Sequence, residues 1–342
     1  MSATLIIGPA WVGDMVMAQS LFALLHRQAP NQPIDVVGPP WSAPLVARMA
    51  EVRRGVPLAV AHGELALGER RRLGHALRSG NYDRAIVLPR SFKSALVPWF
   101  AKIPLRTGFG GEGRRVLLTD VRRLDRRHLD QTVKRFLALG LPIDTPLPEP
   151  ALPVLRVDAD NLARLVERFG LQARPRIALM PGAAFGPAKQ WPVDYFRTLA
   201  GLLGKAGFAV WVLGSAGEQP LGEEICTDSA AVNLCGQTSL EDSVDLLSAT
   251  QAVVTNDSGL MHVAAAAGTH VVALYGSTSP DFTPPLTSRR TILYRNLDCS
   301  PCFQRECPLG HLNCLREITP QAVADAVFTA VNTSGATHTG SA

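Results

Sequence analysis

Short apolar runs alternate with helix-like segments along most of this chain, and this alternation limits the fold more than any other feature. The first run, residues 4–7, leads through a glycine-containing turn into residues 15–28, whose apolar side chains recur at helical spacing. The same order returns as far as residue 140 and again after residue 155. Parallel strands need such crossovers, and their helices cover both faces of the sheet. The sequence therefore predicts doubly wound α/β domains.

A proline-rich stretch interrupts the alternation. Residues 141–153 contain five prolines, which neither a helix interior nor an inner strand accepts. We therefore expect two Rossmann-like domains, residues 1–150 and 151–332, that face each other across a central cleft. The last predicted helix, residues 321–331, is able to pack back on the first domain. Residues 333–342 are expected to form a disordered tail.

Charge is distributed unevenly between the two halves. Residues 1–150 carry 21 Lys and Arg against 12 Asp and Glu, whereas residues 151–342 carry 13 against 17. A basic first half favours an anionic partner. Aromatic residues make up only 6% of the chain and do not alternate with basic ones, which argues against nucleic-acid binding. A phosphorylated or lipid-bound substrate is the better expectation.

The apolar segments are too short to cross a bilayer. No run reaches the roughly 18 residues that a transmembrane helix needs. The start of the chain also lacks the basic region and long apolar core of a signal peptide. We therefore expect a protein that is cytoplasmic and works, if at a membrane, on its inner surface.

Residues 253–268 have the pattern of a strand, a tight polar turn and a helix. Asp257 or Ser258 can cap the helix, and Gly259 lets the backbone approach a ligand closely. His262 follows Ser258 by about one helical turn and so lies near the same place. The pattern predicts a diphosphate site at this helix start. An ordinary capped helix with a structural histidine remains the alternative.

Three other turns follow predicted strands and carry charged side chains. Asp14 stands at a helix start, where it either complements the helix dipole or acts as a general base. Lys189 lies in a glycine-containing turn that lacks the spacing of a nucleotide-binding P-loop, and it is either merely exposed or a cation for a phosphate. Glu218 either stabilises a polar turn or accepts hydrogen bonds from the diol of a ribose. Carboxyl ends of strands meet in one crevice, so these turns are candidate parts of one site.

Two patterns suggest metals. The acidic pair Asp158 and Asp160 resembles the metal-binding string of some glycosyltransferases, but it precedes a helix, and we interpret it as a helix cap. Four thiols within a short segment could hold a structural zinc or iron–sulfur cluster, or stay reduced in a loop. They are Cys299, Cys302, Cys307 and Cys314. The predicted chemistry itself needs no metal and no cofactor.

Five motifs together resemble the ADP-heptose:lipopolysaccharide heptosyltransferases, and within that family the enzymes that add the second heptose. The motifs are GPAWVGDMVMAQS (8–20), LPRSFKSALVP (88–98), PGAAFGPAKQWP (181–192), VTNDSGLMHVAAA (254–266) and LYGSTSPDFTPPL (274–286). The resemblance implies a GT-B fold. It also implies a metal-independent, inverting transfer of L-glycero-D-manno-heptose from ADP-heptose to the first heptose on Kdo2-lipid A.

The resemblance also implies roles for individual residues. Asp14 would be the base and Lys189 the cation that steadies the departing diphosphate, while Asp257 would hold heptose hydroxyls. The implied donor-binding set is Ala184, Phe185, Lys189, Ser215, Glu218, Thr238, Asp257, Ser258, Gly259 and His262. Five basic residues would meet the phosphates and Kdo carboxylates of the lipid A core, unless they form only a solvated helix face. They are Arg70, Arg71, Arg72, Arg90 and Lys93.

Two other classes of protein compete with a transferase. A nucleotide-sugar-binding protein would keep the fold without transferring the sugar, although Asp14 and Lys189 together argue against it. A dinucleotide oxidoreductase is disfavoured because GPAWVGD follows the first predicted strand where G-x-G-x-x-G would be needed. Within the transferases, an enzyme of the same family with a different core acceptor is the closest competitor.

Overall fold

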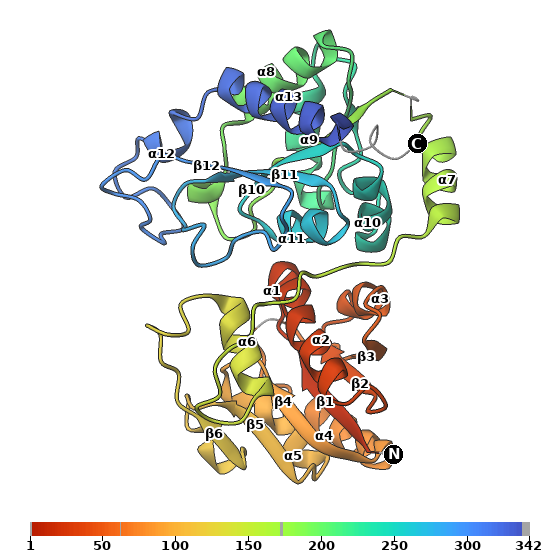
Figure 1. The fold of residues 1–342 in the computed structure, drawn as a ribbon, viewed down its shortest axis with the longest axis vertical. Helices are drawn as coiled ribbons and strands as arrows, with labels where there is room; N and C mark the ends of the chain where they lie inside the picture. The colour runs from red at the N-terminus through yellow and green to blue at the C-terminus, as the bar shows by residue number, and fades with distance from the viewer. Residues whose placement is uncertain (1, 62, 172–173, 337–342) are drawn as a thin grey trace. The chain divides into compact units, whose positions relative to one another are not determined.

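The computed structural model describes residues 2–61, 63–171 and 174–336. The chain divides into two compact units, Met1–Arg156 and Val157–Ala342. Each unit is built on one six-stranded sheet with helices on both faces (Figure 1). Every strand pair in both sheets is parallel.

The first sheet has the strand order β3-β2-β1-β4-β5-β6. Its strands are β1 (Ala3–Ile7), β2 (Ile34–Gly38), β3 (Val52–Pro57), β4 (Tyr82–Val87), β5 (Leu105–Phe109) and β6 (Asp120–Arg122). The helices are α1 (Val12–Met17), α2 (Gln19–Gln28), α3 (Ser42–Ala47), α4 (Leu67–Ala76), α5 (Leu96–Phe100) and α6 (Thr132–Gly140). Helices α1, α2 and α6 contact one another, and α4 packs on α5. Strands β2 and β3 are added on one side of β1, and β4, β5 and β6 on its other side, so the switch point of this sheet lies between β1 and β4.

The second sheet repeats the same topology as β12-β11-β10-β7-β8-β9. Its strands are β7 (Arg176–Met180), β8 (Ala209–Val212), β9 (Val232–Asn233), β10 (Ala252–Asn256), β11 (His270–Tyr275) and β12 (Arg290–Tyr294). The helices are α7 (Ala159–Arg168), α8 (Val193–Lys205), α9 (Gln219–Cys226), α10 (Leu240–Ser248), α11 (Gly259–Ala266), α12 (Asn313–Arg316) and α13 (Pro320–Ala336). Its switch point, where the strand order reverses, lies between β7 and β10.

Burial explains why these segments form inner strands. All five residues of β10 are buried, and Val254 and Leu179 lie side by side in the parallel register of β10 and β7. Trp191 and Phe196 extend this core to the start of α8. A strand buried on both faces is largely apolar, which accounts for the apolar runs in the sequence, and the buried polar residues at the end of β10, Thr255 and Asn256, are hydrogen-bonded.

Several details differ from the sequence-based expectation. Two edge strands, β6 and β12, were not predicted. The first predicted helix starts earlier, at Val12, and is divided at Ala18. Helix α13 packs against α8, β10 and β11 and continues to Ala336, into the stretch that was predicted as a tail from residue 333. Residues 337–342 of that tail lie outside the described residues.

Asp158 confirms the interpretation of the acidic pair as a helix cap. It is the N-cap of α7, and its carboxylate accepts a hydrogen bond from the backbone N–H of Asn161 at 3.0 Å. Asp160 lies in the first turn of the same helix, where a negative charge complements the helix dipole.

Candidate active site

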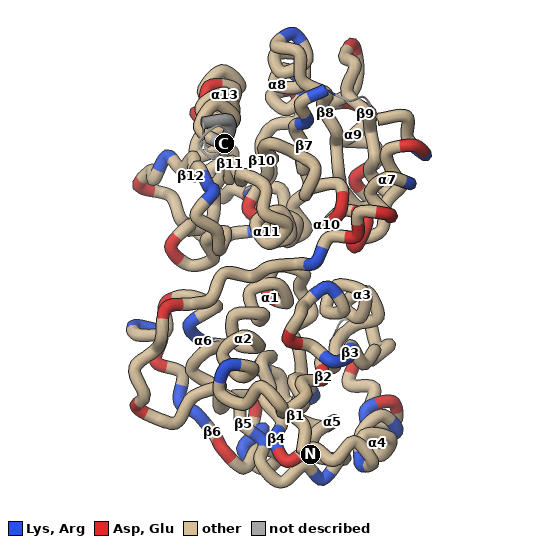
Figure 2. Tube along the Cα trace, turned by 45° about the vertical axis from the view of Figure 1, so that its right-hand side comes forward, with Lys and Arg blue, Asp and Glu red and all other residues tan. Residues whose placement is uncertain are grey.

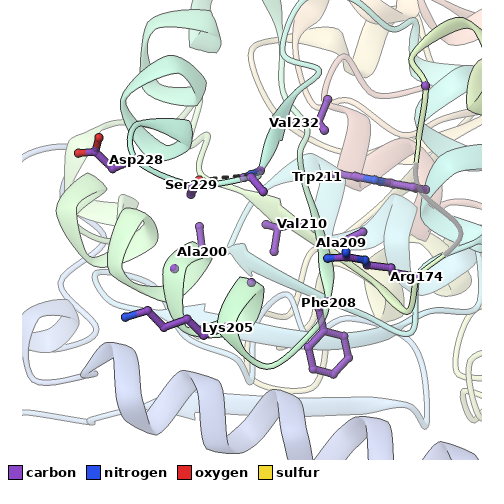
Figure 3. Close-up of a pocket in the computed structure, with 15 residues that line it drawn as sticks. Arg174, Ala200, Lys205, Phe208, Ala209, Val210, Trp211, Asp228, Ser229 and Val232 are labelled. Carbon is purple, nitrogen blue, oxygen red and sulfur yellow. Dashed lines mark hydrogen bonds between the residues drawn. The ribbon is translucent and has the colours of Figure 1, made fainter.

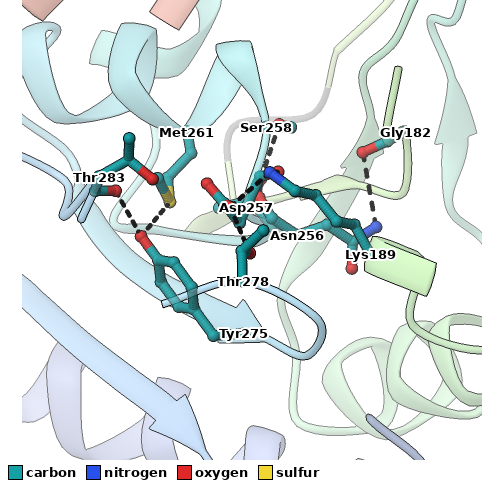
Figure 4. A network of polar contacts seen from close by, with 10 residues as sticks. Gly182, Lys189, Asn256, Asp257, Ser258, Met261, Tyr275, Thr278 and Thr283 are labelled. Carbon is teal, nitrogen blue, oxygen red and sulfur yellow. Dashed lines mark hydrogen bonds and ion pairs between the residues drawn. The ribbon is translucent and has the colours of Figure 1, made fainter. Parts of the chain in front are cut away.

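The switch point of the second sheet brings two predicted site residues into direct contact. Lys189 ends the turn after β7, and Asp257 directly follows β10 (Figure 4). The Lys189 Nζ lies 2.6 Å from the Asp257 Oδ2. Both side chains are well shielded, since Lys189 is 14% and Asp257 5% exposed. Because neighbouring charges in a dry site attract strongly, the pair is an electrostatic centre of this unit.

A residue after β11 completes this centre. The hydroxyl of Thr278 donates to Asp257 Oδ2 at 2.6 Å (Figure 4). Thr278 is buried and was not among the predicted site residues. It lies in the motif LYGSTSPDFTPPL, which supported the family resemblance, but nothing in that motif singles out one hydroxyl. Its position at the third neighbouring strand end is the signal that could have found it.

Asn256 joins the end of β10 to the turn after β7. Its Oδ1 accepts from the Trp191 N–H at 3.0 Å, and its Nδ2 donates to the Pro181 carbonyl at 2.7 Å. Asn256 is fully buried, so each of these polar contacts replaces one that water would otherwise make. The amide therefore fixes the turn that carries Lys189 relative to the end of β10.

The start of α11 differs from the predicted cap. Ser258 occupies the N-cap position, but it makes no side-chain capping hydrogen bond. Its hydroxyl lies instead 3.4 Å from that of Thr255. Asp257 is engaged by Lys189 and Thr278, so the predicted N-cap position of Ser258 is confirmed, whereas a side-chain capping bond from either residue is not found. The dipole of α11 still favours negative charge at this end.

His262 lies inside the same region and is held neutral by its surroundings. It is 4% exposed, and within the part of the chain that the structure describes its Nδ1 has no hydrogen-bond partner. Burial lowers the pKa of His262 to about 4, an effect that Asp257 opposes and Lys189 reinforces. The imidazole is therefore uncharged near neutral pH and can interact with a ligand through hydrogen bonds.

Acid should destabilise the protein partly through His262. Because the folded-state pKa is depressed, the group's contribution is present above pH 6.5 and is lost as the pH falls toward 4. We expect His262→Gln to remove about 2 kcal/mol of the stability loss between pH 7 and pH 4.5, measured by thermal unfolding at both values. An NMR titration that gives the wild-type imidazole a pKa near 6.5 in the folded protein would contradict this cause.

Glu218 and Ser215 form a compact turn after β8. The Glu218 Oε2 accepts from the backbone N–H of Ser215 at 2.6 Å and from its hydroxyl at 2.9 Å. A Cβ on Gly182 would lie 1.7 Å from Glu218 Oε1, so a side chain at residue 182 would displace the Glu218 carboxylate from its place beside the turn after β7. Thr238, in the turn after β9, has a buried Oγ1 without a hydrogen-bond partner among the described residues. The turns after β7, β8 and β9 therefore lie along the same edge of the sheet.

The remaining donor-side residues surround Lys189 and the start of α11. Phe185 is half-buried, with the Lys189 Nζ 5.0 Å from its ring centroid, a distance that suits a cation–π contact. Ala184 is exposed beside it. Gly259 is the first residue of α11.

The first unit has a second group of predicted residues at its own switch point. Asp14 lies in the first turn of α1, directly after β1, and is half-buried. Arg90 is exposed in the loop after β4, and Lys93 lies in the short 3-10 helix, residues Phe92–Ala95, that follows. β1 and β4 are neighbours, so these residues lie at adjacent strand ends.

Arg70 corrects the predicted acceptor set. It is 6% exposed, and its Nε donates to the Leu65 carbonyl at 2.7 Å. Neither a solvated helix face nor a contact with a large acceptor fits this burial, so Arg70 has a structural role. Arg71 and Arg72 are exposed, and Arg72 pairs with Glu69 at 2.5 Å. Figure 2 marks the basic residues along α4 and around β6.

The four cysteines of the predicted metal loop line one small cavity. Its volume is about 20 Å³. Burial and the other three thiols raise the pKa of Cys314, whereas backbone N–H groups, that of Leu312 first, lower the pKa of Cys307. In the part of the chain that the structure describes, no group of three or more His, Cys, Asp or Glu side chains is arranged to hold a metal ion. A metal ion in this loop therefore remains a hypothesis. Elemental analysis that finds less than about a tenth of an equivalent of zinc or iron in anaerobically purified protein would contradict it.

A larger cavity lies away from these residues. It measures about 300 Å³ and is lined by residues such as Lys205, Phe208, Ala209, Asp228 and Val232 (Figure 3). Phe208 and Ala209 lie at the amino end of β8, opposite the strand ends that carry Ser215 and Glu218. Because ligands bind at the carboxyl ends of strands in such sheets, we do not assign the catalytic site to this cavity.

Similarity to known proteins decides the family. A family model described as glycosyltransferase family 9 (heptosyltransferase) matches residues 70–313. The chain belongs to this family. The resemblance inferred from the five motifs is thereby confirmed, and the protein is a glycosyltransferase.

Individual members of family 9 align with this glycosyltransferase over almost its whole length. It is 46% identical to lipopolysaccharide heptosyltransferase 2 of Escherichia coli K12, and the aligned region covers 94% of this chain and 96% of the relative. It is 44% identical to the protein of the same name from Salmonella typhimurium, over 97% and 99%. The solved E. coli ADP-heptose heptosyltransferase II matches with a TM-score of 0.86 and 42% identity, over 97% and 99%. The predicted GT-B fold of two Rossmann-like domains is confirmed.

Within the residues that the structure places, no helix combines the length and the apolar character that a bilayer crossing requires.

Proposed function

We propose that this family 9 enzyme transfers L-glycero-D-manno-heptose from ADP-heptose onto the first heptose of heptosyl-Kdo2-lipid A, with inversion at the anomeric carbon. The network of Lys189, Asp257 and Thr278 at the β7/β10 switch point carries the proposal. It joins a cation to a hydroxyl-binding carboxylate, which are the two groups that a sugar diphosphate needs. The names of relatives at 44 and 46% identity support the sugar and the acceptor.

The second unit would bind the donor. Lys189 and the positive end of α11 offset charge that develops on the departing diphosphate. Asp257 accepts hydrogen bonds from heptose hydroxyls. The neutral imidazole of His262 donates a hydrogen bond to the nucleotide sugar without adding charge. The other residues proposed for this site are Ala184, Phe185, Ser215, Glu218, Thr238, Ser258 and Gly259. In this scheme Lys189 supplies the positive charge for the leaving group, so catalysis needs no metal ion.

The first unit would bind and activate the acceptor. Asp14 takes the proton of the acceptor hydroxyl as its oxygen forms the new bond to the anomeric carbon. The bond from that carbon to ADP breaks at the same time, and ADP leaves with the electron pair. Arg71, Arg72, Arg90 and Lys93 are proposed to contact the phosphates and Kdo carboxylates of the lipid.

The acceptor chemistry also suggests where the enzyme works. A lipid-anchored acceptor must be reached at a membrane, and basic side chains attract an anionic membrane surface by about 1 kcal/mol each. We therefore propose that the protein is cytoplasmic and acts at the inner face of the inner membrane, with the basic first unit toward the lipid.

A transfer assay with defined acceptors tests this function. Purified protein is incubated with ADP-heptose and either heptosyl-Kdo2-lipid A or Kdo2-lipid A, with and without EDTA, and products are followed by mass spectrometry. We expect one added heptose on the first acceptor, unaffected by EDTA. Preference for Kdo2-lipid A would overturn the acceptor. ADP release that does not depend on acceptor would overturn the transfer itself, and a loss in EDTA restored by metal would overturn the metal-free mechanism.

A further inference from the structure

A second cation lies against the ring that Lys189 contacts. The Arg305 guanidinium carbon is 5.6 Å from the Phe185 ring centroid, and the Lys189 Nζ is 5.0 Å from the same centroid. Phe185 and Lys189 belong to the turn after β7, whereas Arg305 comes from the cysteine loop more than a hundred residues later. One aromatic ring is thus a common platform for two positive charges.

Close backbone contact fixes Arg305 on the Lys189 turn. The Arg305 carbonyl accepts a hydrogen bond from the Ala188 N–H at 2.9 Å. Gly186 lies directly under this contact, with a φ of +152°, and a Cβ built on it would be 2.6 Å from the Arg305 carbonyl oxygen. Any larger residue at position 186 would push the two segments apart, so the glycine allows the approach.

The same segment is also attached to the loop after β11. The Phe303 N–H donates to the Ser277 carbonyl at 2.7 Å, and its ring meets that of Phe282 edge-on at 6.4 Å. Ser277 precedes Thr278, whose hydroxyl binds Asp257. Arg305 is therefore held between the two loops that supply both partners of Asp257, although its own side chain is exposed.

The charges at this site explain why a second cation beside Phe185 would help to bind a diphosphate. The ammonium of Lys189 is already paired with Asp257 at 2.6 Å, so its charge is partly offset before any ligand binds. A nucleoside diphosphate carries more negative charge than the remainder can neutralise. An arginine offers a planar fork of donors that matches phosphate oxygens, and stacking on a ring orients that fork.

We propose that Arg305 is a second diphosphate-binding residue, which the cysteine loop positions at the Phe185 ring that Lys189 also contacts, through Gly186, Ala188 and Ser277. The inference rests on the proposed function, because it assigns the diphosphate of a nucleotide sugar to this unit. It also gives the cysteine loop a role in donor binding, whether or not the four thiols hold a metal.

Calorimetric titration of the full-length protein tests the assignment. We compare wild type, Arg305→Ala, Arg305→Lys and Gln304→Ala, an exposed neighbour in the same loop, with ADP and with adenosine as ligands. Arg305→Ala should weaken ADP binding by about tenfold and leave adenosine binding unchanged. Arg305→Lys should recover part of the affinity, and Gln304→Ala should match wild type. The ADP affinity of wild type should also fall more steeply with added salt than that of Arg305→Ala.

Three results would overturn the inference. If Arg305→Ala binds ADP as tightly as wild type does, Arg305 does not contact the diphosphate. An equal loss for adenosine and ADP assigns the effect to the nucleoside side, through Phe185. An equal loss in Gln304→Ala assigns it to loop structure. None of these bears on the transfer reaction, which fails separately if wild-type protein transfers no heptose.

Discussion

Replacing Asp14 by asparagine should lower the turnover number of heptose transfer by about 10²- to 10⁴-fold, the usual contribution of a general base. Asparagine keeps the size of the side chain and its place in the first turn of α1, but it cannot accept the proton of the acceptor hydroxyl. Asp14 belongs to the first unit, whereas the proposed donor residues belong to the second. The affinity for ADP should therefore stay at the wild-type value, as measured by calorimetry.

Asp194→Asn is the matched control for this substitution. Asp194 is also an acid in the first turn of a helix, α8, and it has no proposed part in the reaction. Removing such a charge should cost only about 0.3–1 kcal/mol of stability through the helix dipole. If Asp14→Asn kept more than about a tenth of wild-type turnover, Asp14 would be no more than a helix-start residue of this kind.

Replacing Lys189 by alanine should affect binding and stability together. Loss of the ammonium should weaken ADP binding by about 1.5–3 kcal/mol, the range for a hydrogen bond to a charged group, and slow the transfer. The structure adds a second effect, since the Asp257 carboxylate, which is 5% exposed, would lose its cationic partner. Breaking a buried pair in this way costs about 3–5 kcal/mol, so thermal unfolding should occur at a clearly lower temperature.

A double variant separates the two effects. Lys189→Ala combined with Asp257→Asn removes the unpaired charge while keeping an amide that can accept from Thr278, so it should unfold at a higher temperature than Lys189→Ala alone. ADP binding should stay weak, because the cation is still missing. Lys205→Ala, an exposed lysine at the end of α8, is the control for loss of a positive charge. Wild-type ADP affinity in Lys189→Ala would contradict the diphosphate role.

The inner strands were predictable because burial on both faces leaves little choice of residue. β7 contains the apolar run 177–180 and β10 the run 252–254, each followed by a turn, and the order of such runs in the chain indicated the α/β class. The edge strands were not predictable by the same signal. β6 has only three residues, none of them fully buried, and β12 is half-exposed, so neither needs an apolar run.

Individual candidate residues could be chosen from the sequence, but the contacts between them could not be predicted. Strand–turn–helix patterns located Lys189 and Asp257, yet they stand 68 residues apart, and spacing cannot reveal that they pair. This pairing is also why Asp257 does not cap α11. Arg70 was misassigned because its neighbours in sequence are exposed, whereas the fold turns its guanidinium back onto the Leu65 carbonyl.

The all-parallel sheets have a consequence for how the protein must fold. No strand pair in either unit can form as a local hairpin, and the central pairs join distant strands, as in Ile7 with Val87 and Val254 with Leu179. Each pairing closes a long loop before its contacts contribute, which makes folding slow for the size of the unit. Because each unit has its own sheet and core, the first can complete its pairings during synthesis before the strands of the second leave the ribosome.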